Sequence, residues 1–145
     1  MVLTNKDFLK EIQFHFNYTD EEFEEFINNP RNQDVLSKAP ELSNKTIIIE
    51  VIDAKGCNSQ HKTGDKFYID GAGNLLTKLC PKKICVYALG QIDRLVYAAH
   101  ELIYAGIDPN DMRFKRVSCL DIGLKCGGWG NVLMEFKLVE RGSMT

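Results

Sequence analysis

The feature that most constrains the fold is a change of pattern near residue 45. Before it the chain is acidic and has the spacing of short helices, whereas after it come β-branched runs, all of the glycines and all five cysteines. The run 46–52, Thr-Ile-Ile-Ile-Glu-Val-Ile, is typical of a central strand. A chain of 145 residues is long enough to bury a continuous core. We therefore expect a helical N-terminal extension, residues 1–44, followed by an α+β domain, residues 45–145.

The second segment contains four predicted strands and one long helix. Pro81 suits the first helical position, where no backbone N–H is needed, and Gly106 supplies a stop. Between them, apolar residues recur at three- and four-residue intervals. The predicted elements are strands at 46–52 and 66–69, a helix at 81–105, and strands at 112–119 and 131–139. The order β-β-α-β-β predicts one long helix packed on a small sheet.

Capping residues divide the N-terminal extension into two or three short helices. Thr4 is expected to cap the first helix, and Thr19 with Glu22 forms a capping box for the second. The pair Asn29–Pro30 should end that helix, because a residue before proline avoids the helical region. The acidic residues after Thr19 suit the first turn of a helix and need no bound cation to explain them.

Charge and hydropathy exclude several classes of protein. The formal net charge of −2 gives no electrostatic reason to expect nucleic acid or an anionic membrane as a partner. No apolar run reaches the roughly 18 residues of a membrane span, and the first residues are too charged for a signal peptide. We therefore expect a cytoplasmic protein with reduced thiols. Five cysteines, an odd number, also fit a disulfide framework poorly.

Four cysteines fall at the ends of predicted elements. Cys57 follows the first strand, Cys80 precedes the helix, Cys119 closes the third strand, and Cys126 lies before the last strand. If the first and third strands run parallel, their ends meet at one edge of the sheet, and the loop before the helix is long enough to reach it. The sequence thus predicts a shared thiolate site. Cys85 is expected inside the helix as a small core residue.

Cys80 is the sulfur expected to be most reactive. At a helix N-terminus it faces unpaired N–H groups and the positive end of the dipole, which favour its thiolate. The thiolate is the form that binds zinc or iron and the form that attacks electrophiles. His61, four residues after Cys57, is a further candidate ligand, although a histidine in a polar loop is more often exposed to solvent. The cysteine spacing matches no usual zinc-finger or ferredoxin pattern, so the prediction depends on the fold.

The segment 126–130, Cys-Gly-Gly-Trp-Gly, is the most unusual stretch of the sequence. Glycines let the main chain approach a ligand closely, so Gly127, Gly128 and Trp129 are candidate cofactor contacts. A flexible turn in which Trp129 covers the edge of the core explains the segment equally well. A phosphate-binding loop fits poorly, because no GxGxxG follows a strand and opens a helix.

Three motifs support a family resemblance. They are Gly56-Cys57 with His61-Lys62-Thr63-Gly64-Asp65, the pair Cys80–Pro81, and Cys119. The chain resembles, over about residues 46 to 139, an uncharacterised family of small cysteine-containing proteins of anaerobic bacteria and archaea. The resemblance implies that the cysteines are important, and it implies no particular reaction.

Three functions are compatible with these observations. The first is a protein that binds zinc or an iron–sulfur cluster, serving as an accessory subunit of a larger anaerobic enzyme or as a homo-oligomer. Its expected ligands are Cys57, His61, Cys80, Cys119 and Cys126. The second is an enzyme with Cys80 or Cys119 as nucleophile or acid, assisted by His61 and by Asp65 or Asp121. The third is an interaction module whose acidic N-terminal helices dock a partner while the cysteines only pack.

Overall fold

The structure is a computed structural model that describes residues 5–143. The chain divides into two compact units, Met1–Leu42 and Ser43–Thr145. Thr4, the expected cap of the first helix, lies outside the described residues. None of the helices in residues 5–143 combines the length and the apolar character that crossing a membrane requires.

The first unit is built from capped helices. Asn5 caps α1 by accepting the N–H groups of Asp7 at 3.0 Å and Phe8 at 3.3 Å. The capping box predicted for α2 is present: Thr19 accepts the N–H of Glu22, and the Glu22 carboxylate accepts the N–H of Thr19. The helices are α1 (Lys6–Phe16), α2 (Asp20–Asn28) and α3 (Pro30–Ser43).

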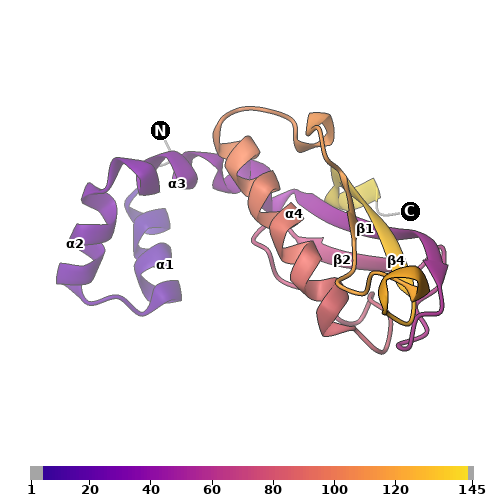
Figure 1. The fold of residues 1–145 in the computed structure, drawn as a ribbon. Helices are drawn as coiled ribbons and strands as arrows, with labels where there is room; N and C mark the ends of the chain where they lie inside the picture. Colours follow the sequence, from indigo (N-terminus) through magenta and orange to yellow (C-terminus); the bar gives the residue numbers. More distant parts are fainter. Residues whose placement is uncertain (1–4, 144–145) are drawn as a thin grey trace. The chain divides into compact units, whose positions relative to one another are not determined.

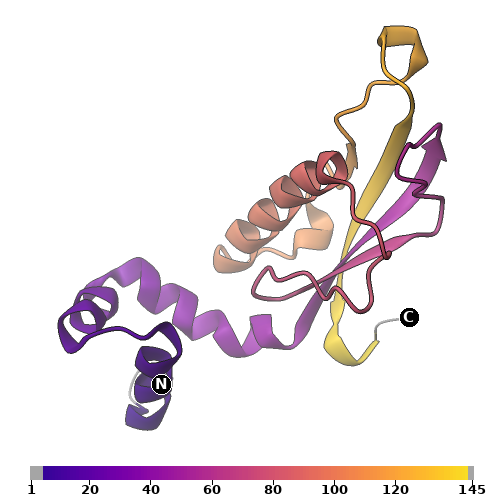
Figure 2. The same ribbon diagram turned by 90° about the horizontal axis from the view of Figure 1, so that it is seen from below.

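The second unit confirms the α+β class and the order β-β-α-β-β. Its strands form one antiparallel sheet in the order β2-β1-β4-β3. Helix α4 lies along one face of this sheet (Figure 1 and Figure 2). The elements are β1 (Lys45–Lys55), β2 (Lys66–Asp70), α4 (Val86–Tyr104), β3 (Arg116–Ser118) and β4 (Asn131–Glu140), with short 3-10 helices η2 (Pro109–Asp111), η3 (Leu124–Cys126) and η4 (Arg141–Ser143).

The core of the second unit lies between α4 and the sheet. On β1, alternate side chains share the face toward the helix, and Ile47, Ile49 and Val51 are at most 1% exposed. Ile47 pairs with Ile69 of β2, and Ile49 pairs with Phe67, so the buried face continues across the strands. The helix contributes one buried stripe at three- and four-residue spacing: Ala88, Ile92, Leu95, Ala99 and Ile103.

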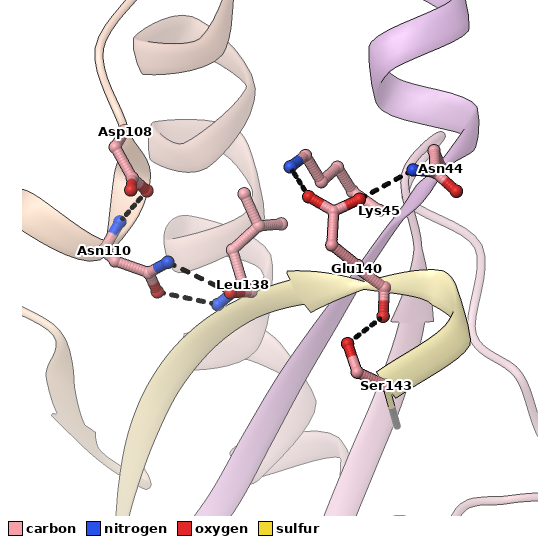
Figure 3. A network of polar contacts seen from close by, with 7 residues as sticks. All are labelled: Asn44, Lys45, Asp108, Asn110, Leu138, Glu140 and Ser143. Atoms are coloured by element: carbon pink, nitrogen blue, oxygen red, sulfur yellow. Dashed lines mark hydrogen bonds and ion pairs between the residues drawn. The ribbon is translucent and has the colours of Figure 1, made fainter. Parts of the chain in front are cut away.

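Strand β3 is shorter than the predicted strand at 112–119, because a side chain takes the place of backbone pairing. The Asn110 amide donates to the carbonyl of Leu138 at 3.0 Å and accepts its N–H at 2.8 Å (Figure 3). The Asn110 side chain therefore provides Leu138 of β4 with the two hydrogen bonds that a residue of a neighbouring strand would provide. Asp108 holds the turn by accepting the N–H of Asn110 at 2.9 Å.

The end of the sheet where β1 begins and β4 ends is closed by polar contacts. The Glu140 carboxylate accepts a hydrogen bond from the Asn44 amide at 2.6 Å and pairs with the ammonium of Lys45 (Figure 3). The N–H of Arg141 donates to the carbonyl of Asn44 at 2.7 Å. These contacts occupy one end of the sheet and leave the loops at the other end to form a site.

Candidate functional site

The strand directions bring two of the predicted cysteines to one end of the sheet. Strands β1 and β3 are both antiparallel to β4, so they run parallel to each other. Cys57 lies two residues after the end of β1, and Cys119 follows directly after β3. The parallel direction of β1 and β3, on which the predicted convergence of these two cysteines depended, is therefore present.

The third cysteine at this end is Cys85, and the prediction that Cys80 opens the helix is wrong. Helix α4 begins at Val86, with Cys85 as its N-cap in an extended conformation. Two lysines, Lys82 and Lys83, would occupy the first turn of a helix that began at Pro81, and their charges oppose the dipole there. Cys85, predicted to lie in the core, is instead half-buried at the helix N-terminus.

A pocket of about 420 Å³ lies between these loops and the start of α4. Three of the five cysteines line it, namely Cys57, Cys85 and Cys119. Its polar and aromatic walls include Ser59, Tyr87, Asp121, Trp129 and Asn131. The volume is in the range of small-molecule sites.

The environment of Cys85 favours its thiolate. Burial acts to raise the pKa of the thiol, but the Ser59 hydroxyl and the N–H groups of Ala88 and Tyr87 outweigh it, and the pKa lies below its ordinary value. The Cys85 side chain makes no close capping hydrogen bond, so these N–H groups act chiefly as a positive field at the sulfur. From the sequence we expected this stabilisation of a thiolate by a helix N-terminus at Cys80.

His61 supports Cys85 through the backbone. It is 5% exposed and packs its ring edge-on against Phe67, with centroids 5.3 Å apart. Its Nε2 accepts the N–H of Cys85 at 3.2 Å, which requires the ring proton to lie on Nδ1. Nδ1 is 3.8 Å from the Asp65 carboxylate. The Nε2 lone pair is thus used to hold the start of α4 and is not free to serve the ligand role predicted for His61.

The sulfurs of Cys80 and Cys119 satisfy backbone groups. The Cys80 sulfur accepts the N–H of Tyr68 at 3.3 Å and donates to the Tyr68 carbonyl at 3.6 Å. The Cys119 sulfur accepts the N–H of Val132 at 3.3 Å and donates to the Asp121 carbonyl at 3.7 Å. Cys80 therefore contacts β2 and does not line the pocket, whereas Cys119 does.

The loop that contains Cys126 is organised by Asp121. Its carboxylate accepts the N–H groups of Gly123 at 2.9 Å and of Trp129 and Gly130 at 3.1 Å. The pKa of Asp121 lies below its ordinary value, chiefly because its carboxylate accepts the bond from Gly123. Desolvation acts to raise this pKa, and the bonds from Gly130 and Trp129 lower it further. Sequence reasoning considered Asp121 only as a catalytic assistant and missed this role, although Asp-x-Gly is a common turn signal.

The glycines of this loop make room for neighbouring protein atoms. A Cβ on Gly128 would lie 2.0 Å from the Asp121 carboxylate, and one on Gly130 would lie 2.2 Å from the backbone of Gly56. Gly127 and Gly128 also line the pocket together with Trp129, whose side chain is 70% exposed. Cys126 is exposed on η3 and is not among the pocket residues.

The predicted metal ligands do not assemble into one group. Within residues 5–143, no set of three or more histidine, cysteine, aspartate or glutamate side chains is placed to hold a metal ion. Of the expected set, only Cys57 and Cys119 line the pocket. Comparison of the chain with protein-family models, with curated proteins and with solved structures found no match.

Proposed function

We propose that the pocket is a reactive-thiolate site, in which Cys85 attacks a small electrophilic substrate. The observation that carries the proposal is the placement of Cys85 at the N-terminus of α4, inside a pocket that two further thiols line. A thiolate is the nucleophilic form of cysteine, and a helix N-terminus stabilises it. This retains the thiolate chemistry expected from the sequence and assigns it to a different cysteine.

The surroundings of Cys85 support a nucleophilic role over a packing role. A packed cysteine is enclosed by apolar side chains, which raise the thiol pKa and make it inert. At Cys85 the Ser59 hydroxyl and two backbone N–H groups instead lower the pKa of the thiol, although burial acts to raise it. The adjacent volume of about 420 Å³ leaves space for a substrate at the same sulfur.

Alkylation at each cysteine tests the proposal. Reduced protein is treated with iodoacetamide across a pH series, and the modified peptides are quantified by mass spectrometry. Cys85 should react fastest in the acidic part of the series, because its thiolate forms at a lower pH than an ordinary thiol. The variant Cys85→Ser should lack this fast reaction while Cys126→Ser retains it. A Cys85 rate with the pH dependence of an ordinary thiol would refute the proposal.

Metal or cluster binding is the second candidate, because three sulfurs line one pocket. Thiolate ligands suit zinc and iron–sulfur clusters. Binding would require the side chains to move closer together than they lie, and Cys119 would exchange its backbone hydrogen bonds for the metal. Metal analysis of protein purified without oxygen tests this candidate: stoichiometric zinc or iron that Cys57→Ser and Cys119→Ser both lose would support it.

A further inference from the structure

The thiols around Cys85 differ in whether their sulfurs are already engaged. The Cys119 sulfur both accepts and donates a backbone hydrogen bond. No hydrogen bond within the described residues engages the sulfur of Cys57, which is half-buried at the pocket wall. Cys57 is therefore the pocket thiol that can react with Cys85 without giving up a structural role.

A tight turn holds Cys57 at the wall of the pocket that Cys85 also lines. The carbonyl of Cys57 accepts the N–H of Gln60 at 3.0 Å. Gly56 and Gln60, at the two ends of this turn, have positive φ values of 66° and 62°. Between them stands Ser59, which also lines the pocket and whose hydroxyl lowers the pKa of the Cys85 thiol. The turn, with Cys57 and Ser59, thus lines the same pocket as Cys85 at the start of α4.

We infer that Cys57 and Cys85 are a redox pair and that the substrate of the pocket is a low-molecular-weight disulfide. The inference rests on the proposed function, because Cys85 must be the attacking thiolate. It adds the chemical class of the substrate and a second reacting residue. Thiol–disulfide exchange needs one activated thiolate and one neighbouring thiol that resolves the mixed disulfide.

The reaction balances in two steps. The Cys85 thiolate attacks one sulfur of the substrate disulfide, a Cys85–substrate disulfide forms, and the other half of the substrate leaves as a thiolate that takes up a proton. The Cys57 thiol then loses its proton and attacks the Cys85 sulfur, which releases the second half as a thiol. The protein ends with a Cys57–Cys85 disulfide, and the substrate disulfide has been reduced to two thiols.

Closing this disulfide would join the loop after β1 to the N-terminus of α4. His61 already connects the same two segments through its bond to the N–H of Cys85. The carbonyl of Lys55 and the backbone of Gly56 pack against Gly130, which fixes the other side of the turn. The oxidised form would therefore change the pocket wall while the sheet keeps its register.

Exchange with bis(2-hydroxyethyl) disulfide, a small uncharged probe, tests the inference. The fully reduced chain is mixed with the probe without oxygen, quenched with acid and mapped by mass spectrometry. Wild type should accumulate a Cys57–Cys85 disulfide and no lasting adduct. Cys57→Ser should instead accumulate the hydroxyethyl adduct on Cys85. The control Cys126→Ser, which removes an exposed cysteine that does not line the pocket, should behave as wild type.

The remaining outcomes separate this inference from the proposed function. A hydroxyethyl adduct that persists on Cys85 equally in wild type and Cys57→Ser overturns the role of Cys57 and leaves Cys85 as a nucleophile. Pairing of Cys85 with Cys119 likewise overturns it. If wild type forms neither an adduct nor a disulfide at Cys85, and Cys85 also lacks fast alkylation, both proposals fail.

Discussion

Ser59 couples the loop after β1 to the thiol at the start of α4. Its hydroxyl helps two backbone N–H groups to overcome the desolvation that would raise the Cys85 pKa. Ser59→Ala should therefore raise this pKa and slow the alkylation of Cys85 at neutral pH by roughly three- to tenfold, which corresponds to about 0.7 to 1.4 kcal/mol of hydrogen-bond energy. The rate is measured with iodoacetamide and peptide mass spectrometry.

The pH dependence of the alkylation rate distinguishes a lost hydrogen bond from a distorted site. Because the thiolate fraction rises as the pH passes the pKa, Ser59→Ala and wild type should differ most at neutral pH and converge at alkaline pH. Ser37→Ala removes an exposed hydroxyl of α3 and serves as the control. An unchanged neutral rate in Ser59→Ala would show that the hydroxyl does not stabilise the thiolate.

His61 influences the same cysteine by anchoring its backbone. His61→Ala leaves the N–H of Cys85 without its acceptor and opens a cavity beside Phe67, so it should lower the free energy of unfolding by about 2 to 4 kcal/mol. Denaturation in urea measures the loss. His61→Gln, whose side-chain oxygen can accept the same N–H, should recover part of it. Equal losses in both variants would mean that packing alone accounts for the effect.

The presence and order of the strands could be predicted from local pattern, whereas the start of α4 could not. The β-branched run at 46–52 lies within β1, and its alternation continues in the pairing with β2 and β4. Pro81 is followed by unfavourable lysines, and the N–H of Cys85 finds its acceptor in His61, 24 residues away in sequence. Because this contact is distant in sequence, local pattern could not show that Cys85, and not Cys80, lies at the N-terminus of α4.

The loop before β4 packs closely against the loop after β1 at Gly130, which leaves no room there for a side chain. Gly130→Ala would place a Cβ 2.2 Å from the carbonyl of Gly56 and 2.4 Å from that of Lys55, and neither backbone can move without disturbing the β1–β4 ladder. We expect it to lower the free energy of unfolding by about 2 kcal/mol or more, as overpacking does. Thermal unfolding followed by circular dichroism measures the change.

Gly90 provides the matched control for this substitution. It is an exposed glycine within α4, and a Cβ there meets nothing within 4 Å. Gly90→Ala should therefore stabilise the protein by up to about 1 kcal/mol, the difference in helix propensity between the two residues. A destabilised Gly90→Ala, or a Gly130→Ala variant as stable as wild type, would contradict the assigned environments.

At the scale of the whole chain, the two units differ in charge. The first unit, Met1–Leu42, has four basic and nine acidic side chains, although the entire chain has a net charge of only −2. Its aromatic rings cluster between α1 and α2, with Phe16 and Phe26 centroids 6.1 Å apart, while Phe14 is 89% exposed. An acidic unit with an exposed aromatic ring suits the interaction role predicted from the sequence, which stays a prediction.

The pocket draws its lining residues from the second unit alone. The loop after β1, the start of α4 and the segment between β3 and β4 supply all of them except Asn131 and Val132, which are the first two residues of β4. Those three segments are held by the sheet and by the bond between His61 and Cys85, which also belong to this unit. A fragment of residues 43–145 should therefore fold cooperatively, and its Cys85 should be alkylated with the same pH profile as in the full chain.

Circular dichroism and peptide-resolved alkylation test that expectation on the fragment and on the full chain in parallel. A folded fragment with an unchanged Cys85 profile would assign the chemistry to the second unit and leave the acidic helices a separate role, such as docking a partner. Loss of fast alkylation in a fragment that still melts cooperatively would instead mean that the helices contribute to the site. Because the fold is monitored independently, unfolding of the fragment cannot be mistaken for that result.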